Sequence, residues 1–279
     1  MRIARTRATF SEELLARMPD GPPPEPVVQR VRLRYAKRGR LRFSSHRDFQ
    51  RALERALRRA NVPMAYSAGF NPHPKISYAN AAPTGAASEA EYVELALTAV
   101  VDPERLRQAL DAALPPGLDL VQVVEAGPGA LADRLQASVW QVELPGLDPE
   151  LAQVALDAFL AADRVEVSRM MKDGPRIFDA RAAVISARLV HEPAPIEHPG
   201  NVTPRVAQAD PGRCAILRLV VRHSTPAVRP DDVLAALRSQ AQLAPPSPPR
   251  MTRLAQGPLD EADGAVADPL AIDRDVAGA

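Results

Sequence analysis

The pattern of hydrophobic and polar positions predicts alternating strands and helices in the first half of the chain. Apolar residues alternate with basic ones from Val31 to Tyr35, which predicts a strand with one buried face and one basic face, and Leu41 and Phe43 resume the alternation after a break at Gly39. From about residue 45 to 60 the apolar residues recur at helical spacing instead, so a helix with one buried face follows. Ser45 and Asp48, three positions apart at its start, resemble a capping box with Asp in place of Glu. Two strands, a helix that opens at Asp102-Pro103 and a final strand are then predicted, the strands at 76–82, 92–97 and 118–124. The order βαββαβ is the split-βαβ or ferredoxin-like order.

A similar order begins again near residue 139. The predicted elements are strands at 139–144, 165–171, 183–190, 215–221 and 251–254, with helices opening at Asp148-Pro149 and near Asp231. This second copy carries one extra strand or hairpin and a long loop, rich in Pro, Gly and Asn, at residues 191–213. We therefore predict an α+β protein with two tandem ferredoxin-like (βαββαβ) domains, at residues 29–128 and 136–254.

Both ends of the chain are predicted to be disordered. Residues 1–28 finish in a proline-rich spacer without a hydrophobic period. Residues 255–279 hold six carboxylates against one arginine and form a predicted acidic tail. Its expected role is to keep the chain soluble, and the alternative is that it transiently covers basic residues when no ligand is bound.

Positive charge is concentrated in one stretch. Residues 30–75 hold thirteen basic and two acidic residues, an excess of eleven, whereas the whole chain has a formal net charge of +1. Within the predicted helix, Arg47, Arg51, Arg55 and Arg59 follow at intervals of four. Like charges at this spacing repel by a few tenths of a kcal/mol per pair. Four in series are better explained if an anion lies against them.

A rigid loop follows the basic helix. The run Tyr66-Ser67-Ala68-Gly69-Phe70-Asn71-Pro72-His73-Pro74-Lys75 contains two prolines on either side of His73, which restrict the backbone to extended or turn conformations. Ordering such a loop on binding costs little entropy, so it is a plausible recognition element. In the alternative interpretation Phe70 fills the core and the prolines only end the helix connection.

Composition excludes several kinds of site. The single Cys214 lies in a strand-like run, where a small buried apolar residue is expected, and one thiol cannot form an internal disulfide or hold an iron–sulfur cluster. No pair of Cys or His has the spacing of zinc ligands. We therefore expect no metal and no cofactor in this chain, and a reducing, cytoplasmic environment. No apolar run approaches the roughly 18 residues of a membrane span, so no membrane partner is expected either.

Several motifs together resemble a known family. They are Phe43-Ser44-Ser45-His46-Arg47-Asp48, Arg55-Ala56-Leu57-Arg58-Arg59-Ala60, the run from Tyr66 to Lys75, and Thr84-Gly85-Ala86-Ala87-Ser88-Glu89, with weaker markers at Arg169-Met170-Met171-Lys172, Asp179-Ala180-Arg181 and Arg229-Pro230-Asp231-Asp232. Over residues 29–240 the chain resembles the bacterial radical SAM-associated family of unknown function. That family occurs as separate proteins or fused on the C-terminal side of B12-type radical SAM proteins.

The resemblance implies a radical SAM enzyme as partner. Radical SAM chemistry needs a [4Fe–4S] cluster held by three clustered cysteines, and this chain has one cysteine. The iron–sulfur cluster and SAM are therefore expected on the partner. This chain would bind, present or position the substrate.

The first functional hypothesis is an accessory protein that binds structured RNA for RNA modification by the radical SAM enzyme. Arginines and lysines would contact phosphates, and the loop would stack on or hydrogen-bond an unpaired base. The nucleic-acid-binding candidates are Lys37, Arg38, Arg40, Arg47, Arg51, Arg55, Arg58, Arg59, Tyr66, Phe70, Asn71, His73 and Lys75.

Two alternatives remain open from the sequence. In the first, the chain is itself an enzyme that processes RNA by metal-free acid–base chemistry, with His46, Asp48 and His73 as catalytic candidates, because they are the one close group of acid–base residues. In the second, the chain is a protein–protein scaffold whose basic face docks an acidic patch of the radical SAM partner. His191, His198 and His223 have no expected role.

Overall fold

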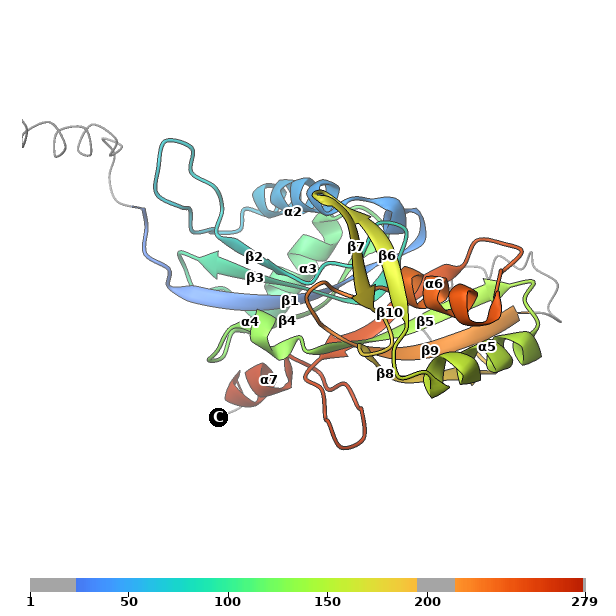
Figure 1. Cartoon of the computed structure of the whole chain (residues 1–279). Coiled ribbons are helices and arrows are strands. Elements are labelled where there is room, and N and C mark those ends of the chain that lie inside the picture. Colours follow the sequence, from blue (N-terminus) through green and yellow to red (C-terminus); the bar gives the residue numbers. More distant parts are fainter. Residues whose placement is uncertain (1–23, 195–213, 278–279) are drawn as a thin grey trace, which may run out of the picture.

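The computed structural model describes residues 24–194 and 214–277. The predicted N-terminal tail, up to residue 23, and most of the predicted loop at 191–213 lie outside the described residues. Helices and strands are mixed along the chain, and most of the strands belong to one large mixed sheet (Figure 1).

The first half of the chain has three helices and a short 3₁₀ helix, η1, among its strands. In chain order the elements are β1 (Gln29–Lys37), η1 (Gly39–Phe43), α2 (His46–Arg59), β2 (Ile76–Ala79), β3 (Ala87–Leu97), α3 (Pro103–Ala113), β4 (Leu118–Glu125) and α4 (Leu131–Arg134). The helix predicted at 45–60 is confirmed. The strand predicted to resume at Leu41 and Phe43 is wrong. Gly39, at φ +53°, turns the backbone, and residues 39–43 form the 3₁₀ helix η1.

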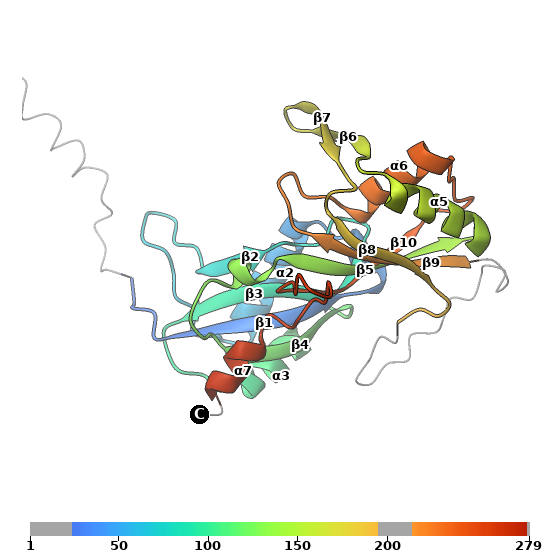
Figure 2. The same cartoon turned by 60° about the horizontal axis from the view of Figure 1, so that its bottom comes forward.

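The second half repeats this order with a hairpin inserted. Its elements are β5 (Ala137–Pro145), α5 (Pro149–Ala161), β6 (Glu166–Met171), β7 (Gly174–Asp179), β8 (Val184–Val190), β9 (Cys214–Arg222), α6 (Pro230–Ala241), β10 (Arg250–Gly257) and α7 (Ala271–Ala277). The hairpin β6–β7 forms a separate two-stranded sheet that projects beside α6 (Figure 2).

Strands from both halves form one continuous sheet of eight strands. Its order is β4-β1-β3-β10-β5-β9-β8, and β2 also pairs with β3. The neighbours within each half are antiparallel, and the halves join where β10 runs parallel to β3 over Thr252–Ala87 and Arg253–Ser88. The two halves are therefore not separated by a linker but share their hydrogen-bonded sheet.

A buried polar network holds this junction together. Arg253 of β10 forms an ion pair with Glu91 of β3, and their side chains are only 4% and 2% exposed. The other carboxylate oxygen of Glu91 accepts a hydrogen bond from the backbone N–H of Ala82 at 3.0 Å. Gln256 of β10 donates to the carbonyl of Ala90 at 2.6 Å. These buried polar groups are paired across the junction, as their desolvation requires.

The two faces of the first half's sheet are covered by different helices. Val31, Leu33 and Val93 pack with residues of α2 and α3 in one core. The opposite face packs against the short α4 and the C-terminal segment, through Tyr92, Val124, Leu131, Leu135 and Leu270 (Figure 1). The second half has its own core between its strands, α5 and α6.

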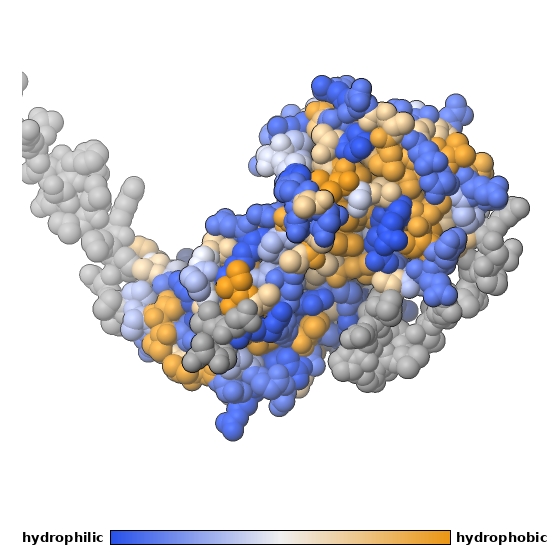
Figure 3. Space-filling view, turned by 90° about the horizontal axis from the view of Figure 1, so that it is seen from below, coloured by the Kyte–Doolittle hydropathy of each residue, from blue (hydrophilic) through white to orange (hydrophobic). Residues whose placement is uncertain are grey.

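Hydrophobic surface is unevenly distributed. On the face seen from below, hydrophobic residues gather mainly over the second half of the chain (Figure 3). Leu151 and Val154 of α5 are 61% and 64% exposed. The basic helix α2 lies on the upper side of Figure 1 and is not part of this surface.

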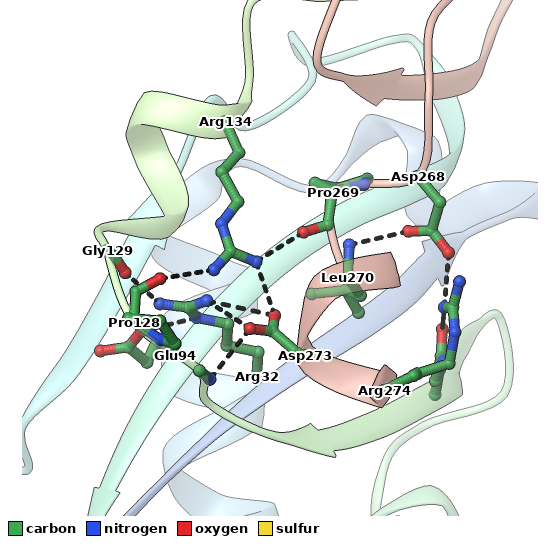
Figure 4. A network of polar contacts seen from close by, with 12 residues as sticks. Arg32, Glu94, Pro128, Gly129, Arg134, Asp268, Pro269, Leu270, Asp273 and Arg274 are labelled. Atoms are coloured by element: carbon green, nitrogen blue, oxygen red, sulfur yellow. Dashed lines mark hydrogen bonds and ion pairs between the residues drawn. The ribbon is translucent and has the colours of Figure 1, made fainter. Parts of the chain in front are cut away.

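The C-terminal segment is folded, which corrects the predicted disordered tail at residues 255–279. Residues 255–257 belong to β10, Leu259 and Val266 form a β-bridge, and α7 packs beside β4. The many carboxylates suggested a solvated tail, but the apolar Leu270 is fully buried and the carboxylate of Asp273 is enclosed by basic groups (Figure 4). The proposed transient cover over the basic helix is also wrong, because this segment lies on the opposite face of the sheet.

Asp273 is the centre of this attachment. Its carboxylate accepts hydrogen bonds from Arg32 of β1 at 2.8 and 3.1 Å, from Arg134 of α4 at 2.9 Å and from the backbone N–H of Gly127 at 2.9 Å (Figure 4). The Arg32 side chain is 2% exposed and also donates to Glu94 at 2.9 Å. The buried guanidinium of Arg32 and the partly buried one of Arg134 therefore share the carboxylate of Asp273, and Arg32 has Glu94 as a second partner.

We expect Asp273→Asn to lower the free energy of unfolding by about 3–5 kcal/mol, because, among the residues that the structure describes, it leaves the buried charge of Arg32 with Glu94 alone and the partly buried charge of Arg134 without a carboxylate. Urea unfolding followed by circular dichroism measures this loss. Asp173→Asn, in the exposed turn between β6 and β7, is the matched control and should change stability by less than about 0.5 kcal/mol. Equal stability of the two variants would contradict the role assigned to Asp273.

His223, for which no role was predicted, follows β9 and contacts both β5 and the segment before it. One ring nitrogen, Nδ1, lies 2.7 Å from the carbonyl oxygen of Leu135, and Nε2 lies 2.6 Å from the hydroxyl of Ser138. A neutral ring satisfies both partners by donating through Nδ1 and accepting at Nε2. Burial lowers the pKa of His223 below its ordinary value of 6.5.

The lowered pKa makes stability depend on pH. Below pH 6.5 the unfolded chain binds a proton at this ring that the folded chain does not, so acidification favours unfolding. We expect this ring to remove at most about 1.4 kcal/mol per pH unit as the pH falls from 6.5 toward the folded-state pKa. Urea midpoints between pH 7.5 and 5.5 measure the effect, and His223→Gln should show a shallower loss over the same range. A variant with the parent's slope would refute this assignment.

Candidate nucleic-acid interface

Helix α2 forms where a cap and an apolar stripe coincide. The hydroxyl of Ser45 accepts a hydrogen bond from the backbone N–H of Asp48 at 3.2 Å, and the Asp48 carboxylate accepts from the backbone N–H of Ser45 at 3.0 Å. The predicted capping box is therefore confirmed. The hydroxyl of Ser45 also donates to the Asp48 carboxylate at 2.7 Å, and this bond, together with the one from the Ser45 backbone N–H, lowers the pKa of Asp48. Phe49, Leu53, Ala56 and Leu57 form the buried face, as predicted from their spacing.

The arginines of α2 point away from that face. Arg47, Arg51, Arg55, Arg58 and Arg59 are all exposed. At about 100° per residue, Arg47, Arg51 and Arg58 lie within about 40° of one another on the helix surface, opposite Phe49. Arg59 turns toward α3, where it donates to the carbonyl of Ala113 at 3.1 Å.

Ion pairing distinguishes this helix from the rest of the basic stretch. In the part of the chain that the structure describes, no carboxylate oxygen lies within 4 Å of the guanidinium groups of α2. Arg47, Arg51 and Arg58 therefore form an outward row of charges that we call the arginine row. It extends for about 16 Å along the axis, from a rise of about 1.5 Å per residue.

Two predicted nucleic-acid contacts are wrong because their charges are used inside the fold. Lys37 is 5% exposed, and its amine lies 3.4 Å from the carbonyl oxygens of Ala82 and Pro83. Burial lowers the pKa of Lys37. Arg38 donates to Glu89 at 2.8 Å and to Asp119 at 2.7 Å. Arg40 of η1 is exposed, as the prediction requires.

The predicted basic face of β1 is likewise not an open surface. Arg32 is covered by the C-terminal segment, Arg30 pairs with Glu94 at 3.2 Å, and Arg34 donates to the carbonyl of Glu89 at 2.9 Å. The charge excess counted along the sequence thus divides into an internal part that stabilises the sheet and an external part on η1, α2 and the loop after it.

The loop from Tyr66 to Lys75 forms an arch beside the C-terminal end of α2 (Figure 1). The backbone N–H of Ser67 donates to the carbonyl of His73 at 2.9 Å, and the N–H of His73 donates to the hydroxyl of Ser67 at 3.0 Å. A bridge between Tyr66 and Pro74 closes its base. The prediction of an ordered turn is confirmed, and Phe70, which is 73% exposed, does not fill the core.

The arch and α2 together line a cleft of about 160 Å³. Glu54, Leu57 and Arg58 form its helix side, Val62 and Met64 its floor, and Tyr66, Pro72, His73 and Pro74 its arch side. Tyr66 is 42% exposed, and Asn71, His73 and Lys75 are exposed around the opening or on the arch. The structure therefore brings most of the predicted nucleic-acid candidates onto one side of the molecule.

The predicted acid–base group is not assembled. His46 is the first residue of α2 and contacts the ring of Tyr78 edge-on, with ring centres 4.9 Å apart. His73 lines the cleft with Arg58, which lies about 18 Å further along the helix axis at 1.5 Å per residue. Asp48 is engaged in the capping box. His46, Asp48 and His73 do not form one catalytic centre.

A second groove was not predicted from the sequence. It has a volume of about 270 Å³ and lies between Arg42, Phe43 and the turn at Thr84-Gly85 on one side, and Asp231 and Arg250 of the second half on the other. Phe43 is 60% exposed, and the guanidinium carbon of Arg42 lies 4.7 Å from its ring centre. The alternation of Leu41 and Phe43 had predicted a strand here, whereas Phe43 ends the 3₁₀ helix η1.

Metal ligands and membrane segments are not found in the described ranges. Among residues 24–194 and 214–277, no three His, Cys, Asp or Glu side chains gather as a metal site would require. None of the helices in this part of the chain has the length and apolar character needed to cross a bilayer.

The sheet, its helices and the arginine row define a mixed helix-and-strand protein with a basic, cleft-bearing surface. Residues 30–230 of this chain match the model of an uncharacterized protein family that is conserved in bacteria, DUF2344. The match covers more than half of the chain, and the chain belongs to this family. None of the curated proteins matches the chain.

The capping box at Ser45 should stabilise the start of α2, the helix that carries the arginine row. We expect Ser45→Ala to destabilise the folded chain by about 1 kcal/mol, because one N-terminal backbone donor loses its acceptor. Thermal and urea unfolding measure the loss. Ser77→Ala, at an exposed position of β2, is the control and should be nearly neutral. A neutral Ser45→Ala would show that tertiary packing alone fixes the start of the helix.

Proposed function

We propose that this chain is a cytoplasmic accessory protein that binds structured RNA through the arginine row and the adjoining cleft, and works with a separate radical SAM enzyme in RNA modification. The observation that carries this proposal is the outward row of Arg47, Arg51 and Arg58, without carboxylate partners among the described residues. Guanidinium groups that repel one another along a helix are stabilised when phosphates lie between them.

The cleft supplies a second kind of contact beside the row. Sequence-specific RNA recognition targets unpaired bases, which stack on aromatic side chains or hydrogen-bond along their edges. Tyr66, Phe70 and His73 present rings on or beside the arch, next to Arg58. An RNA with a double-stranded part and an unpaired segment fits both the row and the cleft.

The fold supports the same proposal more weakly. The strand order β4-β1-β3-β2 of the first half and the order β10-β5-β9-β8 of the second half both follow the ferredoxin-like path, with helices between the corresponding strands. We infer two ferredoxin-like halves fused into one sheet. This fold occurs with many functions, so the argument for RNA rests on the surface and not on the fold.

The radical SAM partner is proposed from the motif resemblance and the cysteine count. These 279 residues contain one cysteine, whereas the cluster of a radical SAM enzyme is held by three clustered cysteines. In the proposed complex, this chain holds the RNA and the partner holds the iron–sulfur cluster and SAM. Catalysis by His46 and His73 in this chain is not proposed, because they lie at opposite ends of α2.

We expect binding of an RNA hairpin with an unpaired loop to weaken steeply with salt. Replacing Arg47, Arg51 and Arg58 together by Gln should weaken binding about 100-fold at 100 mM salt and make the slope of log K against log salt shallower by about 2, at about 0.7 per lost phosphate contact. Fluorescence anisotropy from 50 to 300 mM salt measures both quantities.

The matched control replaces three arginines of the second half, Arg164, Arg176 and Arg238, by Gln. This variant has the same net charge, and it should keep the parent's slope and affinity to within about threefold if binding is local to α2. If both triple variants lose affinity equally, binding follows net charge and the proposed surface is wrong.

A further inference from the structure

Glu54 is an unexpected charge within the arginine row. It lies between Arg51 and Arg58 on the outward side of α2, with Arg55 next to it in the chain. A carboxylate at this position weakens phosphate binding nearby by like-charge repulsion. A surface that binds only phosphates would bind them more tightly without this carboxylate.

The simplest structural role for Glu54 is an ion pair within the helix, and the geometry does not support it. Arg51 and Arg58 lie at the i−3 and i+4 positions, where such pairs form readily. No guanidinium nitrogen of the described residues lies within 4 Å of the Glu54 carboxylate. Glu54 instead lines the cleft between α2 and the arch, beside Arg58.

The cleft has the size and lining for one flat ring. Its volume of about 160 Å³ is well below the roughly 300–1,000 Å³ of pockets that enclose a whole cofactor or drug-sized ligand. Leu57, Val62 and Met64 offer an apolar surface, and Tyr66 and His73 add rings on which a base can stack. Hydrogen bonds between Ser67 and His73 hold the arch in this conformation before any ligand binds.

The cleft places a carboxylate, Glu54, beside a guanidinium, Arg58. A carboxylate accepts two hydrogen bonds side by side, and a neighbouring guanidinium donates. Guanine is the base whose Watson–Crick edge presents two adjacent N–H donors, N1–H and the 2-amino group, beside the O6 acceptor. Adenine, cytosine and uracil each lack that pair of donors.

We propose that this cleft binds a single unpaired guanine of the RNA. Glu54 accepts from N1–H and the 2-amino group, and Arg58 donates one N–H to O6 while its other N–H groups contact a phosphate along the arginine row. This inference rests on the proposed RNA-binding function and adds the base that is recognised. Glu54 is then a specificity residue: it lowers the affinity for phosphates, and it allows the cleft to distinguish guanine from the other bases.

The test uses the full chain and ten-nucleotide uridine RNAs with one central guanosine, inosine or adenosine, measured by fluorescence anisotropy. We expect guanosine to bind about 10-fold more tightly than adenosine, in the range of a good bidentate base contact, and inosine, which lacks the 2-amino group, to lie between them. In Glu54→Gln the guanosine-to-adenosine ratio should fall to about 2 or below, while adenosine RNA binds as well as to the parent or better.

Glu150→Gln, on the exposed surface of α5, is the charge-matched control and should keep the parent's ratio. Circular dichroism melting checks that both variants are folded. A parent that binds all three RNAs equally, or a Glu54→Gln variant that keeps the guanosine preference, overturns the guanine site while leaving the RNA-binding proposal intact. Absence of binding to any of the RNAs and to the loop hairpin overturns both.

Discussion

The fold depends on how strand β3 is shared between the two halves of the chain. One edge of β3 pairs with β1, and the other edge is divided between β2 and β10. The contact with β10 is only two residues long, so backbone hydrogen bonds alone hold the halves weakly. The buried pair of Glu91 and Arg253 lies at this contact and fixes its register, because any shift would leave two desolvated charges without partners.

The large sheet also determines which basic residues are available for binding. Residues that face the sheet or its edges find carboxylates or carbonyls inside the protein, as Arg32, Lys37 and Arg38 do. Helix α2 lies outside the sheet with only its apolar face attached. Among the described residues its arginines have no carboxylate partner, and Arg59 alone donates to a carbonyl, that of Ala113. The division of one basic stretch into a structural part and a surface part therefore follows from the position of each residue relative to the sheet.

The sequence predicted local structure well and long-range pairing poorly. The capping box at Ser45, the apolar face of α2 and the ordered arch all depend on residues within about ten positions of one another. The burial of Arg32, by contrast, depends on Asp273, and the placement of His46 away from His73 depends on the length of α2 and on where the arch folds back. No local pattern distinguishes a carboxylate in a solvated tail from one that is enclosed by two arginines.

The attachment of Asp273 to Arg32 has a consequence for synthesis on the ribosome. The two residues are 241 positions apart, and translation at about 5–20 residues per second separates their appearance by roughly 10–50 s. During that interval β1 carries an arginine whose main counter-ion does not yet exist. A chain that terminates before Asp273 would therefore have Glu94 as the one carboxylate partner of Arg32 within the described residues, and incompletely folded chains of this kind are bound by chaperones and cleaved by proteases.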